Sequence, residues 1–317
     1  LPHPKMQQTI WNYTFQSPIG LAGGLDKNAV CADIWELFGF GFLEIGTLTP
    51  HPQIGNPKPR LFRYPEMEAI VNRMGFNNDG SEIIANRLAM EWKRKRQPHA
   101  IMGVSVGKQK ETPADDIQAV IRDYKTSLKR LYPFGDFFVV NVSSPNTPDL
   151  RSLQDRKPLR QLLFALKDEM FALHGGEHPK PLCVKLAPDL TRDAICDAVD
   201  TVLQCGVDGI IATNTTNQTA GLESGGLSGK PLRERSTEVI RWIADHTGGT
   251  VPLIGCGGIF SADDAIEKLE AGAWLLQIYT SFIFQGPGVV HSIVKGLVDT
   301  MDRRNLSQIR DFYRNHS

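Results

Sequence analysis

Short apolar segments alternate with amphipathic segments along almost the whole chain. Several apolar segments are continuous runs of large hydrophobic residues, which is typical of strands with both faces buried. Eight such segments predict strands, at residues 18–23, 42–48, 101–106, 137–142, 181–186, 208–213, 252–256 and 274–279.

Segments with a helical period follow most of these strands. Residues 112–132 begin with Thr112, Pro113 and Asp115, which predict a cap, a first-turn proline and an acidic third position. Residues 261–271 begin with Ser261, have Asp264 three positions later and stop at Gly272, which predicts a helix. Further helices are predicted at 28–38, 80–97, 157–173, 191–204, 236–246 and 287–303.

Eight strand-then-helix units predict an α/β fold, a (β/α)8 TIM barrel formed as a single domain over residues 1–317. A doubly wound open sheet is the alternative, but no G-x-G-x-x-G motif follows the first strand. Two connections are long, 49–100 and 214–235, and predict functional insertions after strands 2 and 6. Residues 5–15 predict an N-terminal hairpin that closes the bottom of the barrel.

The amino-acid composition argues against several classes of protein. Of the 317 residues, 41% are hydrophobic, and 35 basic residues balance 35 acidic ones, which argues against a protein that coats nucleic acid. The five cysteines form no CxxC motif, so a disulfide framework or a zinc site is not indicated. No apolar run approaches the roughly 20 residues that span a bilayer.

Active groups of a barrel enzyme lie at the carboxyl ends of its strands. In FFVVNVSSPNTPDL (137–150), a buried strand ends in Asn141, Ser144 and Asn146 between prolines. The other ends carry amides, hydroxyls, glycines and lysines, and only Asp26 supplies a carboxylate there. Glycoside hydrolysis requires two carboxylates and metal hydrolysis requires clustered histidines, so both are disfavoured. The pattern indicates a site that holds a flat cofactor rich in heteroatoms.

Two further features support a cofactor. Strand 7 ends in Gly257 and Gly258, where backbone N–H groups can approach a phosphate closely, although the same glycines could only make a tight turn. Lys185 ends an apolar strand, where a lysine without an anionic partner is costly to bury. Its charge either stabilises an electron-rich cofactor ring or pairs with a neighbouring carboxylate, such as Asp26.

Long motifs in the chain resemble one family. LAGGLDKN (21–28), FLEIGTLTPHPQIGNPKPRLFR (42–63), NRMGFNN (72–78), NVSSPNTP (141–148), VKLAPDL (184–190), IATNTT (211–216), GGLSGKPL (225–232) and QIYTSF (277–282) resemble dihydroorotate dehydrogenase, specifically its quinone-dependent, membrane-associated class, class 2. The resemblance implies an FMN-dependent barrel that oxidises (S)-dihydroorotate to orotate in pyrimidine (UMP) biosynthesis, with Ser144 as the base at C5 and hydride transfer from C6 to flavin N5.

The resemblance also implies the site residues. Those expected against FMN are Gly23, Gly24, Leu25, Asp26, Lys27, Thr47, Ser105, Asn141, Lys185, Thr213, Gly229, Gly258, Tyr279 and Thr280. Those expected against the substrate are Lys27, Asn72, Arg73, Met74, Gly75, Phe76, Asn141, Asn146, Asn214 and Thr215. Arg63 and Tyr279 match positions that contact the quinone, and no metal is implied.

The class implies ubiquinone or menaquinone as acceptor and a peripheral position on a bacterial or mitochondrial inner membrane. The N-terminal helices that reach the membrane in the family are expected to be absent from this chain, because only about 17 residues precede the core. No nucleic acid and no obligate protein partner are implied.

A few positions depart from the family pattern. Ser105 stands where asparagine is usual, Gly23 replaces a usual alanine, and Asp149 replaces a glycine, which aspartate can do if positive φ is required. Three alternatives stay open: a non-redox barrel acting on a phosphorylated sugar or amine, a catalytically silent binding module, and a family member that uses fumarate or NAD.

Overall fold

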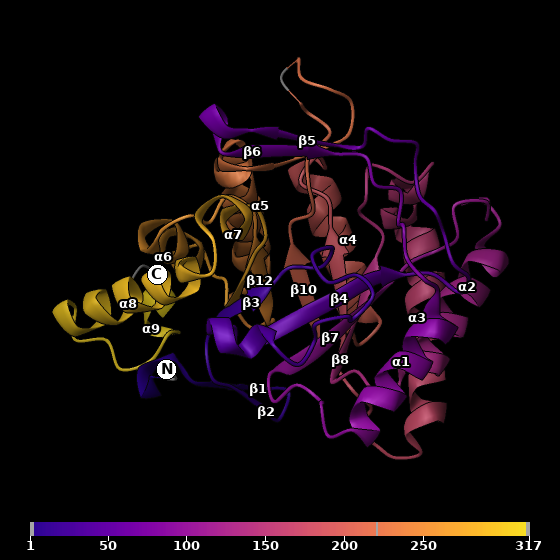
Figure 1. Cartoon of the computed structure of the whole chain (residues 1–317), viewed down its shortest axis with the longest axis horizontal. Helices are drawn as coiled ribbons and strands as arrows, with labels where there is room; N and C mark the ends of the chain where they lie inside the picture. The colour runs from indigo at the N-terminus through magenta and orange to yellow at the C-terminus, as the bar shows by residue number, and fades with distance from the viewer. Residues whose placement is uncertain (1–2, 220, 315–317) are drawn as a thin grey trace.

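The structure, a computed structural model, describes residues 3–219 and 221–314 and contains a closed barrel of eight strands (Figure 1). Neighbouring strands pair in parallel throughout the barrel. The predicted TIM barrel is therefore confirmed, and each predicted strand agrees with an observed one within two residues. In barrel order the strands are β10 (Gly209–Ala212), β12 (Leu253–Cys256), β13 (Leu275–Ile278), β3 (Ile19–Leu21), β4 (Phe42–Leu48), β7 (Ile101–Val106), β8 (Phe137–Asn141) and β9 (Leu182–Leu186).

Helices cover the outside of the barrel (Figure 1). Helix α6 begins directly after Ser261, as predicted. A capping box forms there, with Ser261 Oγ accepting from the N–H of Asp264 and the Asp264 carboxylate accepting from the N–H of Ser261. The helices are α1 (Ser81–Lys93), α2 (Ile117–Leu131), α3 (Arg156–His174), α4 (Arg192–Gln204), α5 (Arg233–Thr247), α6 (Ala262–Glu270), α7 (Thr280–Gln285), α8 (Gly288–Arg303) and α9 (Asp311–Arg314). The short 3-10 turns are η1 (Pro4–Met6), η2 (Trp35–Phe38), η3 (Pro65–Met67), η4 (Leu150–Gln154) and η5 (Lys230–Leu232).

The helix predicted at 28–38 is wrong, because only the turn η2 forms there. The Asp26 carboxylate accepts hydrogen bonds from the N–H groups of Val30, at 2.8 Å, and Cys31, at 3.0 Å. It also accepts from the Trp35 indole nitrogen at 3.1 Å. These bonds hold the segment in a loop that competes with helix formation.

The predicted start of the next helix is also wrong. Helix α2 begins at Ile117, and Asp116 caps it by accepting a hydrogen bond from the N–H of Ala119 at 3.0 Å. The threonine–proline pair at 112–113 lies in the preceding loop instead. The actual cap is the aspartate nearest the periodic apolar residues.

The N-terminal hairpin of β1 (Gln8–Ile10) and β2 (Tyr13–Phe15) closes the lower end of the barrel, as predicted. Phe15 packs edge-to-face on Phe42 with ring centroids 5.5 Å apart, and Phe42 also contacts Phe137. Gly103 makes room for this layer, because a Cβ there would lie 2.2 Å from the Phe137 ring. The bottom of the barrel is thus a layer of interlocking aromatic rings.

Replacing Phe42 by alanine is expected to lower the free energy of unfolding by about 3–5 kcal/mol, since large-to-small changes in a close-packed core leave a cavity. The side chain is fully buried. Chemical unfolding followed by circular dichroism measures the loss. The matched control is Phe164→Ala on α3, where the exposed ring should contribute less than about 1 kcal/mol. Equal losses in both variants would contradict the role assigned to the aromatic layer.

The two predicted insertions meet over the upper end of the barrel (Figure 1). The first forms β5 (Leu61–Tyr64) and β6 (Ala69–Asn72), and the second forms β11 (Gly226–Gly229). They pair as an antiparallel sheet in the order β11-β6-β5. The insertions were predicted but their pairing was not. Within residues 3–219 and 221–314, no helix is long and apolar enough to cross a membrane.

Candidate active site

A cavity lies between the carboxyl ends of the barrel strands and the small sheet β11-β6-β5. The structure brings most of the predicted site residues into its lining. These are Gly23, Gly24, Lys27, Thr47, Asn72, Met74, Gly75, Phe76, Asn141, Ser144, Asn146, Lys185, Thr213, Asn214, Thr215, Gly229, Gly258, Tyr279 and Thr280.

Five predicted residues do not line this cavity. Asp26 organises its own loop, and Leu25 packs against the barrel core. Ser105 is buried behind Thr47, with their hydroxyls hydrogen-bonded at 2.9 Å, so the direct cofactor contact expected of it is not supported by the geometry.

The two predicted arginines lie on the small sheet and its edge. Arg73 donates to the carbonyl oxygen of Pro59 at 3.1 and 3.2 Å and lies over the Phe62 ring. Arg63 is exposed on β5. Direct contact of Arg73 with a substrate inside the cavity is therefore not supported.

A buried charged group forms the floor of the cavity. Lys185 Nζ lies 3.3 and 3.4 Å from the two carboxylate oxygens of Glu44, and Gln277 Nε2 donates to Glu44 Oε2 at 2.8 Å. Burial alone would lower the pKa of Lys185, but the Glu44 carboxylate outweighs burial and raises it. The lysine is therefore a cation, and its partner is Glu44, not Asp26 as one alternative suggested.

Glu44 and Gln277 were not predicted as site residues, because both lie inside strands and not at their ends. Both side chains are almost fully buried, at 1% and 0% exposure. Each lies in a largely apolar strand, FLEIGTL or LLQI, and such a polar residue within the strand was the signal that could have identified it. A Cβ at Gly23 would lie 2.3 Å from Glu44 Oε1, so the glycine leaves space for this carboxylate.

Glycines with positive φ form one wall of the cavity. Gly257 and Gly258 follow β12 with φ of 121° and 73°, and Gly229 has φ of 101°. A Cβ at Gly258 would lie 2.4 Å from the Cα atom of Arg233, so no side chain fits between this loop and α5. Successive backbone N–H groups in such a conformation make a concave anion site.

Amide side chains form the opposite wall. Asn141 Nδ2 donates to Thr47 Oγ1 at 2.7 Å, and Asn146 Nδ2 donates to Asn72 Oδ1 at 3.1 Å. These bonds link β8 and its loop to β4 and to β6 of the small sheet. The amides are therefore held in place by one another, and they present both donors and acceptors to the cavity.

Ser144 lies in the loop between these amides and is 7% exposed. Its Oγ accepts a hydrogen bond from the N–H of Asn146 at 3.2 Å. Asp149, further along the loop, has φ of 52°, the positive value that aspartate was expected to tolerate. The Ser144 hydroxyl is thus oriented by the backbone N–H two residues further along the same loop.

Lys27 is the second cation of the cavity. Its Nζ donates to Asn77 Oδ1 at 3.1 Å. Burial, together with the positive charge of Arg60, lowers the pKa of Lys27 to about 8. The amine therefore changes protonation state close to physiological pH, and an anion bound beside it would favour the charged form.

Comparison with known proteins agrees with this geometry. The sequence model of the family described as dihydroorotate dehydrogenase matches residues 5–301. The chain belongs to the dihydroorotate dehydrogenase family. A relative from Thermosynechococcus vestitus, named dihydroorotate dehydrogenase (quinone), is 47% identical over 96% of this chain and 84% of its own length. A relative of the same name from Chloroflexus aurantiacus is 48% identical over 89% of this chain and 79% of its own length.

Solved dihydroorotate dehydrogenase structures share the fold. The crystal structure of DHODH from Eimeria tenella in complex with ferulenol superposes with a TM-score of 0.90 and 37% identity. The match covers 98% of this chain and 88% of that one. The ligand-free form from the same organism gives a TM-score of 0.89. Among residues 3–219 and 221–314, no three His, Cys, Asp or Glu side chains cluster as a metal site.

Proposed function

We propose that this chain is an FMN-dependent enzyme that oxidises (S)-dihydroorotate to orotate in pyrimidine biosynthesis and passes the electrons to a quinone. The observation that carries the proposal is the convergence of the Ser144 hydroxyl, the asparagine side chains and the Lys185 cation in one cavity of a dihydroorotate dehydrogenase barrel. Each group suits one part of that reaction.

The cavity fits FMN in three respects. The glycine wall suits a phosphate, Lys185 suits an electron-rich ring, and Gln277 Oε1 is a buried acceptor without a partner in the described part of the chain. When bound, FMN would accept the hydride from C6 of the substrate at its N5. The residues proposed to hold it are Gly23, Gly24, Lys27, Thr47, Asn141, Lys185, Thr213, Ser228, Gly229, Gly257, Gly258, Gln277, Tyr279 and Thr280.

The amide wall suits dihydroorotate, a small ring with N–H and C=O edges and a carboxylate. Asparagine can donate to and accept from such edges, and it disfavours analogues that leave its buried groups unpaired. Lys27 supplies a positive charge for the carboxylate or a carbonyl. The residues proposed to contact the substrate are Lys27, Asn72, Met74, Gly75, Phe76, Asn141, Asn146, Asn214 and Thr215.

Ser144 is the proposed base that removes the C5 proton. The N–H of Asn146 donates to Ser144 Oγ, which favours the developing negative charge on that oxygen. The Ser144 side chain is itself buried, which limits the access of bulk water to the proton transfer. The serine requires a route for its own proton, so the reaction should be faster at higher pH.

A quinone is the proposed electron acceptor, with Tyr279 at the cavity and Arg63 on β5 as its contacts. Quinones dissolve in membranes, so the proposal includes peripheral contact with a bacterial or mitochondrial inner membrane. The proposed quinone is ubiquinone or menaquinone.

The test is anaerobic mixing of the purified protein, supplied with FMN, with dihydroorotate. Bleaching of the flavin spectrum supports the dehydrogenase, and a colourless, folded protein that does not take up FMN would favour the non-redox alternative. Adding a ubiquinone analogue, a menaquinone analogue, fumarate or NAD in turn identifies the acceptor. Reoxidation by fumarate or NAD and not by quinone would refute the quinone part.

Orotate affinity is expected to fall by up to about tenfold per pH unit as the pH rises above 8, because only protonated Lys27 attracts the anion. The sign follows from the pKa of Lys27, which lies at about 8. Titrating the FMN-loaded protein with orotate between pH 7 and 9.5, by the shift in flavin absorbance, measures the effect.

Lys27→Met is the control for this titration. It should bind orotate weakly and with little dependence on pH in the same range. A parent affinity that stays constant through pH 9.5 would contradict the role of Lys27, as would a Lys27→Met variant that keeps the parent's pH dependence.

A further inference from the structure

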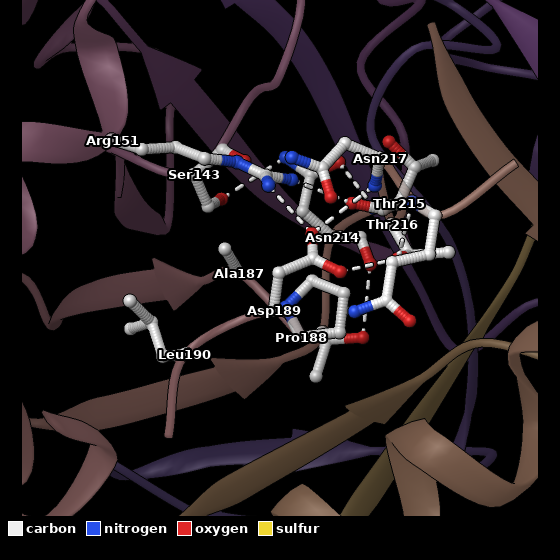
Figure 2. A network of polar contacts seen from close by, with 12 residues as sticks. Ser143, Arg151, Ala187, Pro188, Asp189, Leu190, Asn214, Thr215, Thr216 and Asn217 are labelled. Atoms are coloured by element: carbon white, nitrogen blue, oxygen red, sulfur yellow. Dashed lines mark hydrogen bonds and ion pairs between the residues drawn. The ribbon is translucent and has the colours of Figure 1, made fainter.

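One arginine outside the cavity joins three loops at its edge (Figure 2). Arg151 lies on η4, the turn that follows the loop carrying the serine. Its Nε donates to the carbonyl oxygen of Ser143 at 2.9 Å, its Nη1 to Asp189 Oδ2 at 2.5 Å, and its Nη2 to the carbonyl oxygen of Thr215 at 2.8 Å. These acceptors follow three neighbouring barrel strands, β8, β9 and β10.

Asp189 extends the same network (Figure 2). Its Oδ1 accepts from the hydroxyl of Thr216, and its Oδ2 accepts from the N–H of Asn217 at 3.1 Å. The Arg151 and Asp189 side chains are 20% and 13% exposed, so solvent screens their ion pair only in part. The carboxylate therefore holds the arginine and the loop after β10 at once.

Two acceptors of Arg151 belong to residues that are direct sequence neighbours of residues lining the cavity. Ser143 directly precedes Ser144, and Thr215 directly follows Asn214. Asn214 Nδ2 also donates to Ser143 Oγ at 3.0 Å, which ties the two loops together a second time. Neither Arg151 nor Asp189 lines the cavity, so any effect on the reaction passes through these neighbours.

We propose that Arg151, held by Asp189, is a positioning residue that fixes the serine loop (141–150) against the loop after β10 (213–217). The proposal rests on the proposed function. A planar guanidinium donates in three fixed directions, whereas a lysine ammonium at the end of a flexible chain cannot reach all three acceptors. Arg151→Lys therefore keeps the charge and removes the geometry.

Arg235 provides a matched control. From α5 its Nε donates to the carbonyl oxygen of Pro188 and its Nη2 to that of Leu190, both at 2.7 Å. It thus anchors the same β9 loop on either side of Asp189. Its remaining hydrogen bond goes to Glu238, so within the described part of the chain Arg235 bonds to neither the serine loop nor the loop after β10.

The experiment compares Arg151→Lys and Arg235→Lys, both loaded with FMN, in two measurements. Bleaching by saturating dihydroorotate should slow about 10- to 100-fold in Arg151→Lys, because a misplacement near 1 Å has an effect of that size. Arg235→Lys should stay within about twofold of the parent. Hydrogen–deuterium exchange should increase at 141–150 and 213–217 only in Arg151→Lys, and near 188–190 in Arg235→Lys.

Parental bleaching and parental exchange in Arg151→Lys would overturn the proposal. So would equal slowing in both variants, because general loosening of the β9 loop would then account for it. A parent protein that dihydroorotate does not bleach would refute the dehydrogenase function instead, and the exchange measurement would still decide whether Arg151 holds the two loops.

Discussion

Replacing Ser144 by alanine is expected to slow bleaching of the bound FMN by dihydroorotate about 10²- to 10⁴-fold, the usual contribution of a positioned base. The serine lies in the cavity between asparagine side chains, and its Oγ accepts a hydrogen bond from the N–H of Asn146. Removing the oxygen leaves this cavity without its proposed base. Anaerobic stopped-flow absorbance at saturating dihydroorotate measures the rate.

Two comparisons make the Ser144 result specific. Ser152→Ala removes an exposed hydroxyl that bonds only locally, to the carbonyl oxygen of Asp149, and should leave the rate unchanged. The parent rate should rise with pH at saturating substrate, whereas the residual rate of Ser144→Ala should not. If Ser144→Ala bleaches at the parental rate, Ser144 is not the base, and the alternative of a catalytically silent binding module would be favoured.

Local patterns predicted the barrel strands because most of their residues are apolar and the strands are buried on both faces. They failed at 28–38, where the Asp26 carboxylate binds backbone N–H groups that a helix would have used. They also could not predict the small sheet. Its pairing joins Asn72 to Gly226, and nothing near either residue in the sequence specifies the other.

For the site as well, local patterns predicted some features and missed others. Motifs identified most of the residues that line the cavity, because strand ends converge in a barrel. They did not reveal which residues stand behind others, such as Ser105 behind Thr47. Nor could spacing reveal Arg151, whose three acceptors belong to separate loops and are brought together only by the barrel.

Removing Lys185 is expected to have two separable effects. Lys185→Met leaves the Glu44 carboxylate buried without its cation, which should cost about 3–5 kcal/mol of stability. It also removes the positive charge proposed to face the electron-rich ring, which should slow bleaching by dihydroorotate about 10²- to 10³-fold. Thermal unfolding and stopped-flow absorbance measure the two effects.

The double variant Glu44→Gln, Lys185→Met separates them. It contains neither charge, so most of the lost stability should return, since replacing both members of a buried ion pair is often close to neutral. The rate should stay slow, and the midpoint reduction potential of bound FMN should stay below the parental value, because the cation is still missing. If the double variant regains the parental potential together with its stability, the Lys185–Glu44 pair serves only to hold the barrel interior together. If the potential stays low in a stable protein, the charge itself acts on the ring, and the lysine rather than the fold determines how readily the cofactor is reduced.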